Sequence, residues 1–238
     1  MTDARTEQLA AQLAQVQQRI DAACAAAGRE PADITLIVVS KTWPADDVRR
    51  LAGLGVRDFG ENRDQEAAPK AAETSDLGLR WHFVGQLQSN KANSVARYAD
   101  LVHSVDRASL VTALDKGAAK AGRRVGCLIE VDLSEGSEGR GGARPDDVAA
   151  LADAVAAADH LDLRGVMGVA PLDPRDQRAA SATAFDRLAA IAADLRRAHP
   201  AATLLSAGMS EDLEEAVSAG ATHLRVGSAV LGTRPPLG

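Results

Sequence analysis

The sequence predicts a single parallel (β/α)8 barrel, also called a TIM barrel, in which strands and helices alternate along the chain. Eight short runs rich in apolar and β-branched residues are separated by stretches long enough for a helix. No second cluster of hairpin signals accompanies them, and 238 residues suit one such barrel. An open doubly wound sheet is the alternative. The predicted strands are residues 34–40, 56–59, 80–84, 100–104, 124–133, 162–169, 202–206 and 222–226.

An amphipathic helix is predicted ahead of the first strand. Between residues 6 and 27 an apolar side chain recurs every three to four residues, and Gly28 ends the pattern. The apolar stripe consists of Leu9, Leu13, Val16, Ile20 and Cys24. We expect residues 1–28 to pack on the barrel through this stripe. No linker, long low-complexity tract or charge block divides the chain, so residues 1–238 are predicted to form one domain.

The composition argues against several functional classes. Hydrophobic residues make up 46% of the chain and aromatic residues 3%, so Ala, Val and Leu must fill the core. A net charge of -6 argues against a nucleic-acid surface. No apolar stretch is long enough to span a membrane and no signal-peptide core is present, so we expect a cytoplasmic protein. The spacings of Cys24, Cys127, His82 and His103 do not suit a metal site, and none is expected.

Lys41 is the most informative single residue, because it directly follows the apolar run of the first predicted strand. The chain has five lysines against twenty-two arginines, and the other four lie in polar or helical surroundings where nothing is expected to desolvate them. These are Lys70, Lys91, Lys116 and Lys120. A lysine held among apolar side chains loses hydration of its ammonium form, which lowers its pKa and makes the amine a nucleophile. The obvious use is a Schiff base, and the alternative is a lysine that reaches solvent along its flexible stem.

Two segments near the end of the chain are suited to binding a phosphate group. Ser210 follows the seventh predicted strand and is expected to be the N-cap of a helix beginning at Glu211, where its hydroxyl can face an anion. Gly227 and Ser228 follow the eighth strand, and Gly227 lets the backbone approach a ligand closely. Taken separately, these features are also explained by helix capping and a tight turn. Together they occupy the usual phosphate site of such barrels.

An imine-forming lysine and a phosphate site at the same barrel mouth together suggest pyridoxal 5'-phosphate (PLP) as cofactor. Six segments, in order along the chain, then resemble the pyridoxal phosphate homeostasis protein family, a one-domain relative of the alanine racemase N-terminal barrel (fold-type III). They are VSKTWP at 39–44, GENRDQE at 60–66, WHFVGQLQSNK at 81–91, HSVD at 103–106, GMS at 208–210 and RVGS at 225–228. The segment 81–91 is the most diagnostic of them.

The resemblance implies a role for each candidate site residue. Lys41 would form the Schiff base with PLP, while Ser210, Gly227 and Ser228 would hold its phosphate. Arg225 would face the pyridine nitrogen, disfavour its protonation and weaken the ring as an electron sink. The remaining residues implied to line the pocket are Asn62, His82 and Met209.

The family further implies a binding protein without established turnover, which sequesters PLP or delivers it to apo-enzymes that depend on it. The alternative is an active amino-acid racemase of the same barrel type. Racemases take a second acid-base group from a tyrosine of an added domain, whereas the only tyrosine here, Tyr98, is expected away from the pocket. Arg140, in the glycine-rich loop 136–142, stands where relatives often carry a lysine, so a hand-over of PLP through that position is in question. We expect a monomer or a weak homodimer.

Overall fold

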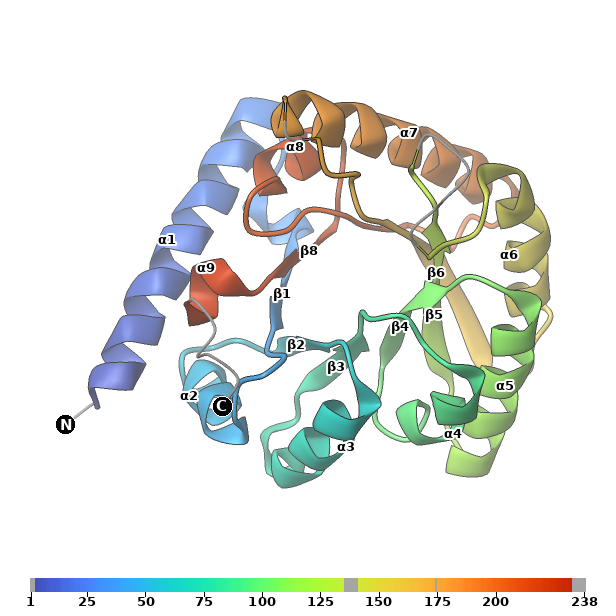
Figure 1. Ribbon diagram of the computed structural model, residues 1–238, viewed down its shortest axis with the longest axis horizontal. Coiled ribbons are helices and arrows are strands. Elements are labelled where there is room, and N and C mark those ends of the chain that lie inside the picture. The colour runs from blue at the N-terminus through green and yellow to red at the C-terminus, as the bar shows by residue number, and fades with distance from the viewer. Residues whose placement is uncertain (1–2, 135–140, 174, 233–238) are drawn as a thin grey trace.

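The structure, a computed structural model, describes residues 3–134, 141–173 and 175–232. Its eight strands form a closed parallel barrel in which each strand pairs with the next one along the chain and β8 pairs with β1 (Figure 1). The strands are β1 (Thr35–Val39), β2 (Asp58–Glu61), β3 (Arg80–Phe83), β4 (Leu101–Val105), β5 (Val125–Val131), β6 (Leu161–Gly168), β7 (Leu204–Ser206) and β8 (His223–Val226). The predicted barrel is confirmed, and every predicted strand overlaps an observed one.

Helices surround the strands (Figure 1). They are α1 (Ala4–Ala27), α2 (Ala45–Gly53), α3 (Asp64–Glu73), α4 (Ala92–Val95), α5 (Ala108–Ala121), α6 (Val148–Ala156), α7 (Gln177–Ala198), α8 (Leu213–Ser218) and α9 (Ser228–Leu231). The predicted first helix is confirmed as α1, which packs against α2, α8 and α9. The Asp3 carboxylate caps its start by accepting from the Thr6 amide at 2.8 Å, and Gly28 ends it with a φ of 64°.

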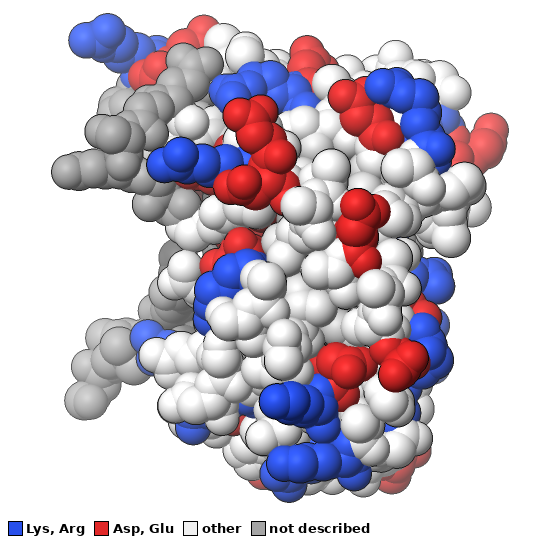
Figure 2. All heavy atoms as spheres, turned by 90° about the vertical axis from the view of Figure 1, so that its right-hand side faces the viewer, with Lys and Arg blue, Asp and Glu red and all other residues white. Residues whose placement is uncertain are grey.

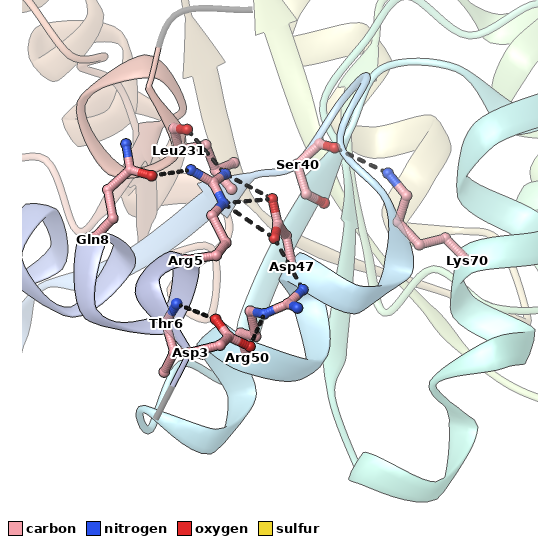
Figure 3. Close-up of polar contacts among 9 residues, drawn as sticks. All are labelled: Asp3, Arg5, Thr6, Gln8, Ser40, Asp47, Arg50, Lys70 and Leu231. Carbon is pink, nitrogen blue, oxygen red and sulfur yellow. Dashed lines mark hydrogen bonds and ion pairs between the residues drawn. The ribbon is translucent and has the colours of Figure 1, made fainter. Parts of the chain in front are cut away.

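Arg5, near the start of α1, joins this helix to two elements beside the barrel (Figure 3). Its guanidinium group donates to the Asp47 carboxylate in α2, with 2.6 Å between NH2 and Oδ2, and to the Leu231 carbonyl in α9 at 3.1 Å. It also lies over the Trp43 ring, 4.5 Å from the ring centroid. Trp43 and Leu231 belong to the segments that follow β1 and β8. Helix α1 therefore supports two segments that also lead to the functional site.

The apolar core is continuous between the strands and the helices. Its largest fully buried side chains include Phe59, Phe83 and Phe185, and many of its other members are Ala, Val and Leu, as the composition predicted. Cys24 and Cys127 are buried free thiols within it. On the face that carries α5 and α6, acidic and basic side chains of the described residues are interspersed (Figure 2). That face therefore offers no broad basic surface of the kind that nucleic acids bind.

Gly165 in β6 occupies a position that only glycine suits. Its φ is 147°, and a Cβ built there would lie 1.9 Å from the Leu204 carbonyl oxygen in β7. We expect Gly165→Ala to lower the free energy of unfolding by about 3 kcal/mol, through backbone strain and disturbed pairing of β6 with β7. Urea denaturation measures this loss. Gly53→Ala is the matched control, because nothing lies within 4 Å of that position, and equal losses in both variants would contradict the argument.

Candidate functional site

A cavity of about 450 Å³ opens at the carboxyl ends of the strands. Its lining comes largely from the segments that follow β1, β2, β6, β7 and β8, which is where barrels of this type carry their chemistry. Seven of the eight predicted site residues line it, namely Lys41, Asn62, Met209, Ser210, Arg225, Gly227 and Ser228. The closed barrel thus brings residues from both ends of the chain to one space.

The turn that carries Lys41 is held in an unusual backbone conformation. Lys41 itself is partly buried, and the next residue, Thr42, has a φ of 70°, a region that β-branched residues rarely adopt. The Thr42 amide donates to Oε2 of Glu66 in α3 at 2.8 Å. Because the neighbouring helix stabilises this conformation, the direction in which Lys41 leaves β1 depends on tertiary contacts as well as on local preference.

Lys70 in α3 is buried against the residue that precedes Lys41. Its ammonium group forms an ion pair with the Glu61 carboxylate and donates to the Ser40 carbonyl at 2.9 Å, the contact drawn in Figure 3. The Ser40 hydroxyl donates to the same Glu61 oxygen at 2.7 Å. Burial raises the pKa of Glu61, although Lys70 opposes the shift. The expectation that nothing desolvates Lys70 is therefore wrong, since this residue is 7% exposed.

The loops after β7 and β8 meet at the cavity through two serine hydroxyls. Ser228 Oγ donates to Ser210 Oγ at 3.1 Å, and the Ala229 amide donates to the same Ser210 oxygen at 3.3 Å. The N-cap of α8 is Asp212 rather than Ser210, so the predicted capping role of Ser210 is wrong. The Asp212 carboxylate accepts from the Met209 amide at 2.6 Å and so stabilises the turn that leads to α8. Ser210 faces the cavity from this turn.

Arg225 is the buried cation of the cavity, with 5% of its surface exposed. Its NH1 donates to Ser206 Oγ at 2.6 Å and its NH2 donates to the Gly168 carbonyl at 2.9 Å. Burial lowers the pKa of the Arg225 guanidinium to about 10, while the charges of Asp212 and Glu130 oppose the shift. The group therefore stays positively charged at neutral pH. Within the described residues it is held by neutral acceptors and forms no ion pair.

His82, the eighth predicted site residue, does not line this cavity. The residue is 4% exposed and its ring lies inside the barrel, with Nε2 3.0 Å from Asp58 Oδ1 and Nδ1 3.0 Å from His103 Nε2. His82 belongs to β3, and its ring contacts side chains of the neighbouring strands β2 and β4 rather than the space at the barrel mouth. Hydrogen bonds connect His82 to the cavity residue Arg225 through His103 and Ser206.

Glu130, near the end of β5, is an ionisable group that the sequence analysis missed. It lines a smaller cavity of about 120 Å³ at the barrel mouth, and its Oε2 is buried without a hydrogen-bond partner among the described residues. Burial and the nearby Asp106 raise the pKa of Glu130 to about 7, and Arg225 opposes them. A single acidic residue inside the apolar run of residues 127–131 was the available signal.

The raised pKa of Glu130 predicts a pH-dependent stability. A carboxyl whose pKa is raised by folding stabilises the fold while it is protonated, and this contribution is lost as the pH rises from 4.5 to about 7. Replacing Glu130 by glutamine should remove this loss, which amounts to at most about 3 kcal/mol. Urea denaturation at about pH 5 and about pH 8 measures it, on either side of the folded-state pKa. Glu7→Gln, at an exposed site on α1, is the control and should leave the wild-type pH profile unchanged.

The diagnostic segment 81–91 leads into a second cavity of about 520 Å³ beside the first. Gln86, Gln88 and Lys91 line it, and Asn62 lines both cavities. A Cβ on Gly85 would lie 2.2 Å from the Asn62 carbonyl oxygen, so glycine allows the segments after β2 and β3 to pack closely here. The Oδ1 of Asn62 is buried and lacks a hydrogen-bond partner among the described residues. Asn62 is thus placed to offer this oxygen to a bound molecule.

Three further findings concern the described part of the chain. It contains no group of three or more His, Cys, Asp or Glu side chains arranged to hold a metal ion. None of its helices combines the length and apolar character needed to cross a membrane. Arg140 and most of the glycine-rich loop 136–142 lie outside the described residues.

Comparison with known proteins places the chain in a family. It matches the family described as alanine racemase, N-terminal domain, over residues 7–235. It is 42% identical to the pyridoxal phosphate homeostasis protein of Pseudomonas aeruginosa over 226 residues, which cover 95% of this chain and 96% of that protein. The structure of PipY from Synechococcus elongatus PCC7942, with PLP bound, has a TM-score of 0.81 and 36% identity, covering 94% of this chain and 100% of that one.

A more distant match supports the fold alone. The alanine racemase of Corynebacterium glutamicum has a TM-score of 0.69 at 17% identity and covers 98% of this chain but 62% of its own. The two relatives at higher identity and the family match each extend over nearly the whole chain. The chain therefore belongs to the alanine racemase N-terminal domain family and, within it, to the pyridoxal phosphate homeostasis proteins.

Proposed function

We propose that this chain binds PLP in the cavity of about 450 Å³ that Lys41 lines, called the main cavity from here on. In this proposal it functions in PLP homeostasis by sequestering the cofactor or delivering it to apo-enzymes. The observation that carries the proposal is the joint presence of Lys41, Arg225 and the paired serines 210 and 228 around one cavity. A volume of about 450 Å³ lies within the usual range of small-molecule sites. The relatives named above, one of them solved with PLP bound, support the same function.

The residues of the cavity fit the cofactor. PLP supplies an aldehyde that condenses with a primary amine and a phosphate dianion that needs hydrogen-bond donors. In our proposal Lys41 provides the amine, while Ser210, Ser228 and the backbone at Gly227 bind the phosphate. The Asn62 oxygen, which has no partner among the described residues, can accept a hydrogen bond from a ring substituent. Met209, which is 39% exposed, would add an apolar contact from the lining of the cavity.

Arg225 would face the pyridine nitrogen and keep it unprotonated. A guanidinium that remains charged at neutral pH can donate to a neutral ring nitrogen but repels a protonated one. The ring then withdraws electrons less strongly than a ring paired with a carboxylate. This arrangement suits a protein that holds PLP more than one that turns over amino acids.

We further infer that the chain does not racemise amino acids. Racemisation needs acid-base groups on both faces of the substrate carbon. The phenolic oxygen of Tyr98, the only tyrosine in the sequence, donates to Asp64 Oδ1 at 3.4 Å, and this residue does not line the cavity. Incubating the loaded protein with each common L-amino acid and assaying the D-enantiomer tests the inference. Sustained turnover would favour the racemase alternative.

Absorbance spectroscopy with borohydride trapping tests PLP binding. We expect the loaded wild-type protein to be yellow and to lose its colour on reduction, with the reduced adduct mapping to the peptide that contains Lys41. A wild-type protein that takes up no added PLP would reject the proposed function. An adduct on a different lysine would reject only the assignment of Lys41.

A further inference from the structure

A chain of buried hydrogen bonds runs through the barrel from Arg225 to Asp58. Arg225 NH1 donates to Ser206 Oγ at 2.6 Å, and this oxygen lies 3.0 Å from His103 Nδ1. His103 Nε2 lies 3.0 Å from His82 Nδ1, and His82 Nε2 lies 3.0 Å from Asp58 Oδ1. Each of the five residues is at most 6% exposed. Because β4 and β7 are not neighbours in the sheet, the contact of His103 with Ser206 crosses the barrel interior.

Asp58, at the end opposite Arg225, determines in which direction the hydrogen bonds are donated. Burial favours its neutral form, but hydrogen bonds from His82 and Arg80 outweigh burial and lower the pKa of Asp58 to about 2. The Nε of Arg80 lies 2.7 Å from Asp58 Oδ1. At neutral pH the Asp58 carboxylate is therefore ionised and can only accept hydrogen bonds. It follows that His82 carries a proton on Nε2.

The position of the proton on His103 follows from the need to satisfy every buried polar group. Burial lowers the pKa of His103 well below its usual range, so its ring is neutral and holds one proton. With that proton on Nε2, His103 donates to His82 Nδ1 and accepts from the Ser206 hydroxyl. Ser206 in turn accepts from Arg225. Every donor in the chain then has an acceptor, as buried polar groups require.

The opposite arrangement leaves a buried group unsatisfied. With the proton of His103 on Nδ1, the Ser206 oxygen would receive two N–H donors, and its own hydroxyl hydrogen would lack an acceptor among the described residues. Such a loss costs about 1–3 kcal/mol. His82 would also have to be a buried imidazolium in order to donate to His103, with the His223 ring centroid 6.2 Å away and Arg80 bound to the same carboxylate. The arrangement with Nε2 protonated on both rings is therefore favoured.

We propose that Asp58, His82, His103 and Ser206 are positioning residues for Arg225, and that every hydrogen bond in their chain is donated in the direction of Asp58. Ser206 and the Gly168 carbonyl hold two nitrogens of the guanidinium group, so its remaining N–H groups keep one orientation toward the cavity. The positioning role rests on the proposed function, in which Arg225 faces the PLP ring. The direction in which these hydrogen bonds are donated does not depend on that function.

The direction is tested in the cofactor-free protein by two-bond proton–nitrogen correlation NMR of the imidazole rings near neutral pH. We expect His82 and His103 both to be neutral rings protonated on Nε2, with their signals assigned from His82→Gln and His103→Gln. A proton on Nδ1 of either ring would overturn the directional chain. Since no PLP is needed, this result is independent of whether the protein binds the cofactor.

The positioning role is tested in the loaded protein with Ser206→Ala, which removes the contact to Arg225 without adding bulk. We expect about tenfold weaker PLP binding, since a hydrogen bond to a charged group is lost, together with a shifted absorbance maximum. His82→Phe, which breaks the chain away from the cavity, should change both quantities in the same direction. In an Arg225→Gln background, Ser206→Ala should cause no further change, because the positioning residues act through Arg225.

Ser104→Ala is the matched control, because Ser104 in β4 carries an equally buried hydroxyl that has no hydrogen-bond partner among the described residues. Its spectrum and PLP affinity should equal those of the wild type. Equal effects of Ser206→Ala in the wild-type and Arg225→Gln backgrounds would overturn the positioning role, as would an unchanged spectrum and affinity in folded Ser206→Ala. A wild-type protein that takes up no PLP would reject the proposed function and this role together, while the direction would still be decided by NMR.

Discussion

Lys41→Ala is expected to abolish both the yellow colour of the PLP-loaded protein and the adduct trapped by borohydride. A Schiff base requires a primary amine, and Lys41 is the lysine among the described residues that line the main cavity. The change removes that amine while the proposed phosphate contacts at Ser210 and Ser228 remain. Absorbance spectra after incubation with PLP and gel filtration measure the loss, and peptide mapping of the reduced protein identifies the modified side chain.

Two further lysine variants sharpen this test. Lys41→Arg keeps a positive charge at the position but cannot form a Schiff base, so it should also be colourless. Lys91→Ala removes a lysine that lines the second cavity rather than the first, and it should keep the colour and the adduct. A yellow Lys41→Ala protein whose adduct maps to Lys70 or Lys91 would refute the assignment.

Lys70→Met is expected to lower the free energy of unfolding by about 3–5 kcal/mol, because it leaves a buried charge without its partner. Glu61 is 0% exposed, and the Lys70 ammonium group is bound by both its carboxylate and the Ser40 carbonyl. Methionine keeps an unbranched side chain of similar length without the charge. Urea denaturation measures the loss, and an unchanged midpoint would show that the pair contributes nothing.

The loss in Lys70→Met should also depend on pH. Burial already raises the pKa of Glu61 in the wild type, and removal of Lys70 takes away the main opposing influence. A carboxyl with a raised folded-state pKa destabilises the fold where it must ionise, so the loss is greatest above that pKa and shrinks as the pH falls toward 4.5. Adding Glu61→Gln should recover most of the loss. Lys120→Met, at an exposed site on α5, should stay within about 0.5 kcal/mol of the wild type.

Apolar runs were sufficient to locate the eight strands, but they misplaced the start of β2. The prediction began at Val56, whereas β2 spans Asp58–Glu61 and includes two buried carboxylates. Each carboxylate has its own cation: Asp58 pairs with Arg80, and Glu61 pairs with Lys70. Hydrophobicity alone misplaces the bounds of a strand that buries charges in this way, because the partners that make burial tolerable lie elsewhere in the chain.

Lys41, Ser210, Gly227 and Ser228 could be predicted because barrel chemistry lies at strand ends and strand ends can be read from the sequence. The assignment of Asn62, Met209 and Arg225 to the cavity came from the family resemblance. The role of Lys70 was missed, although a signal existed: it lies one helical turn after Ala67 and beside Ala71, both on the buried face of α3. The interior position of His82 was harder to foresee, because a short buried strand shows no polar alternation that reveals where each side chain points.

Local pattern was enough to establish the barrel, the helix α1 and the position of Lys41 and the two phosphate loops at strand ends, since periodicity and strand ends are properties of neighbouring residues. The closure of the barrel decided the rest. It joined His103 to Ser206 across the interior, set Lys70 against Glu61, and held Thr42 at a positive φ beside Lys41. These contacts depend on which side chains from distant parts of the chain reach the same point, and that is settled only when all eight strands are in register.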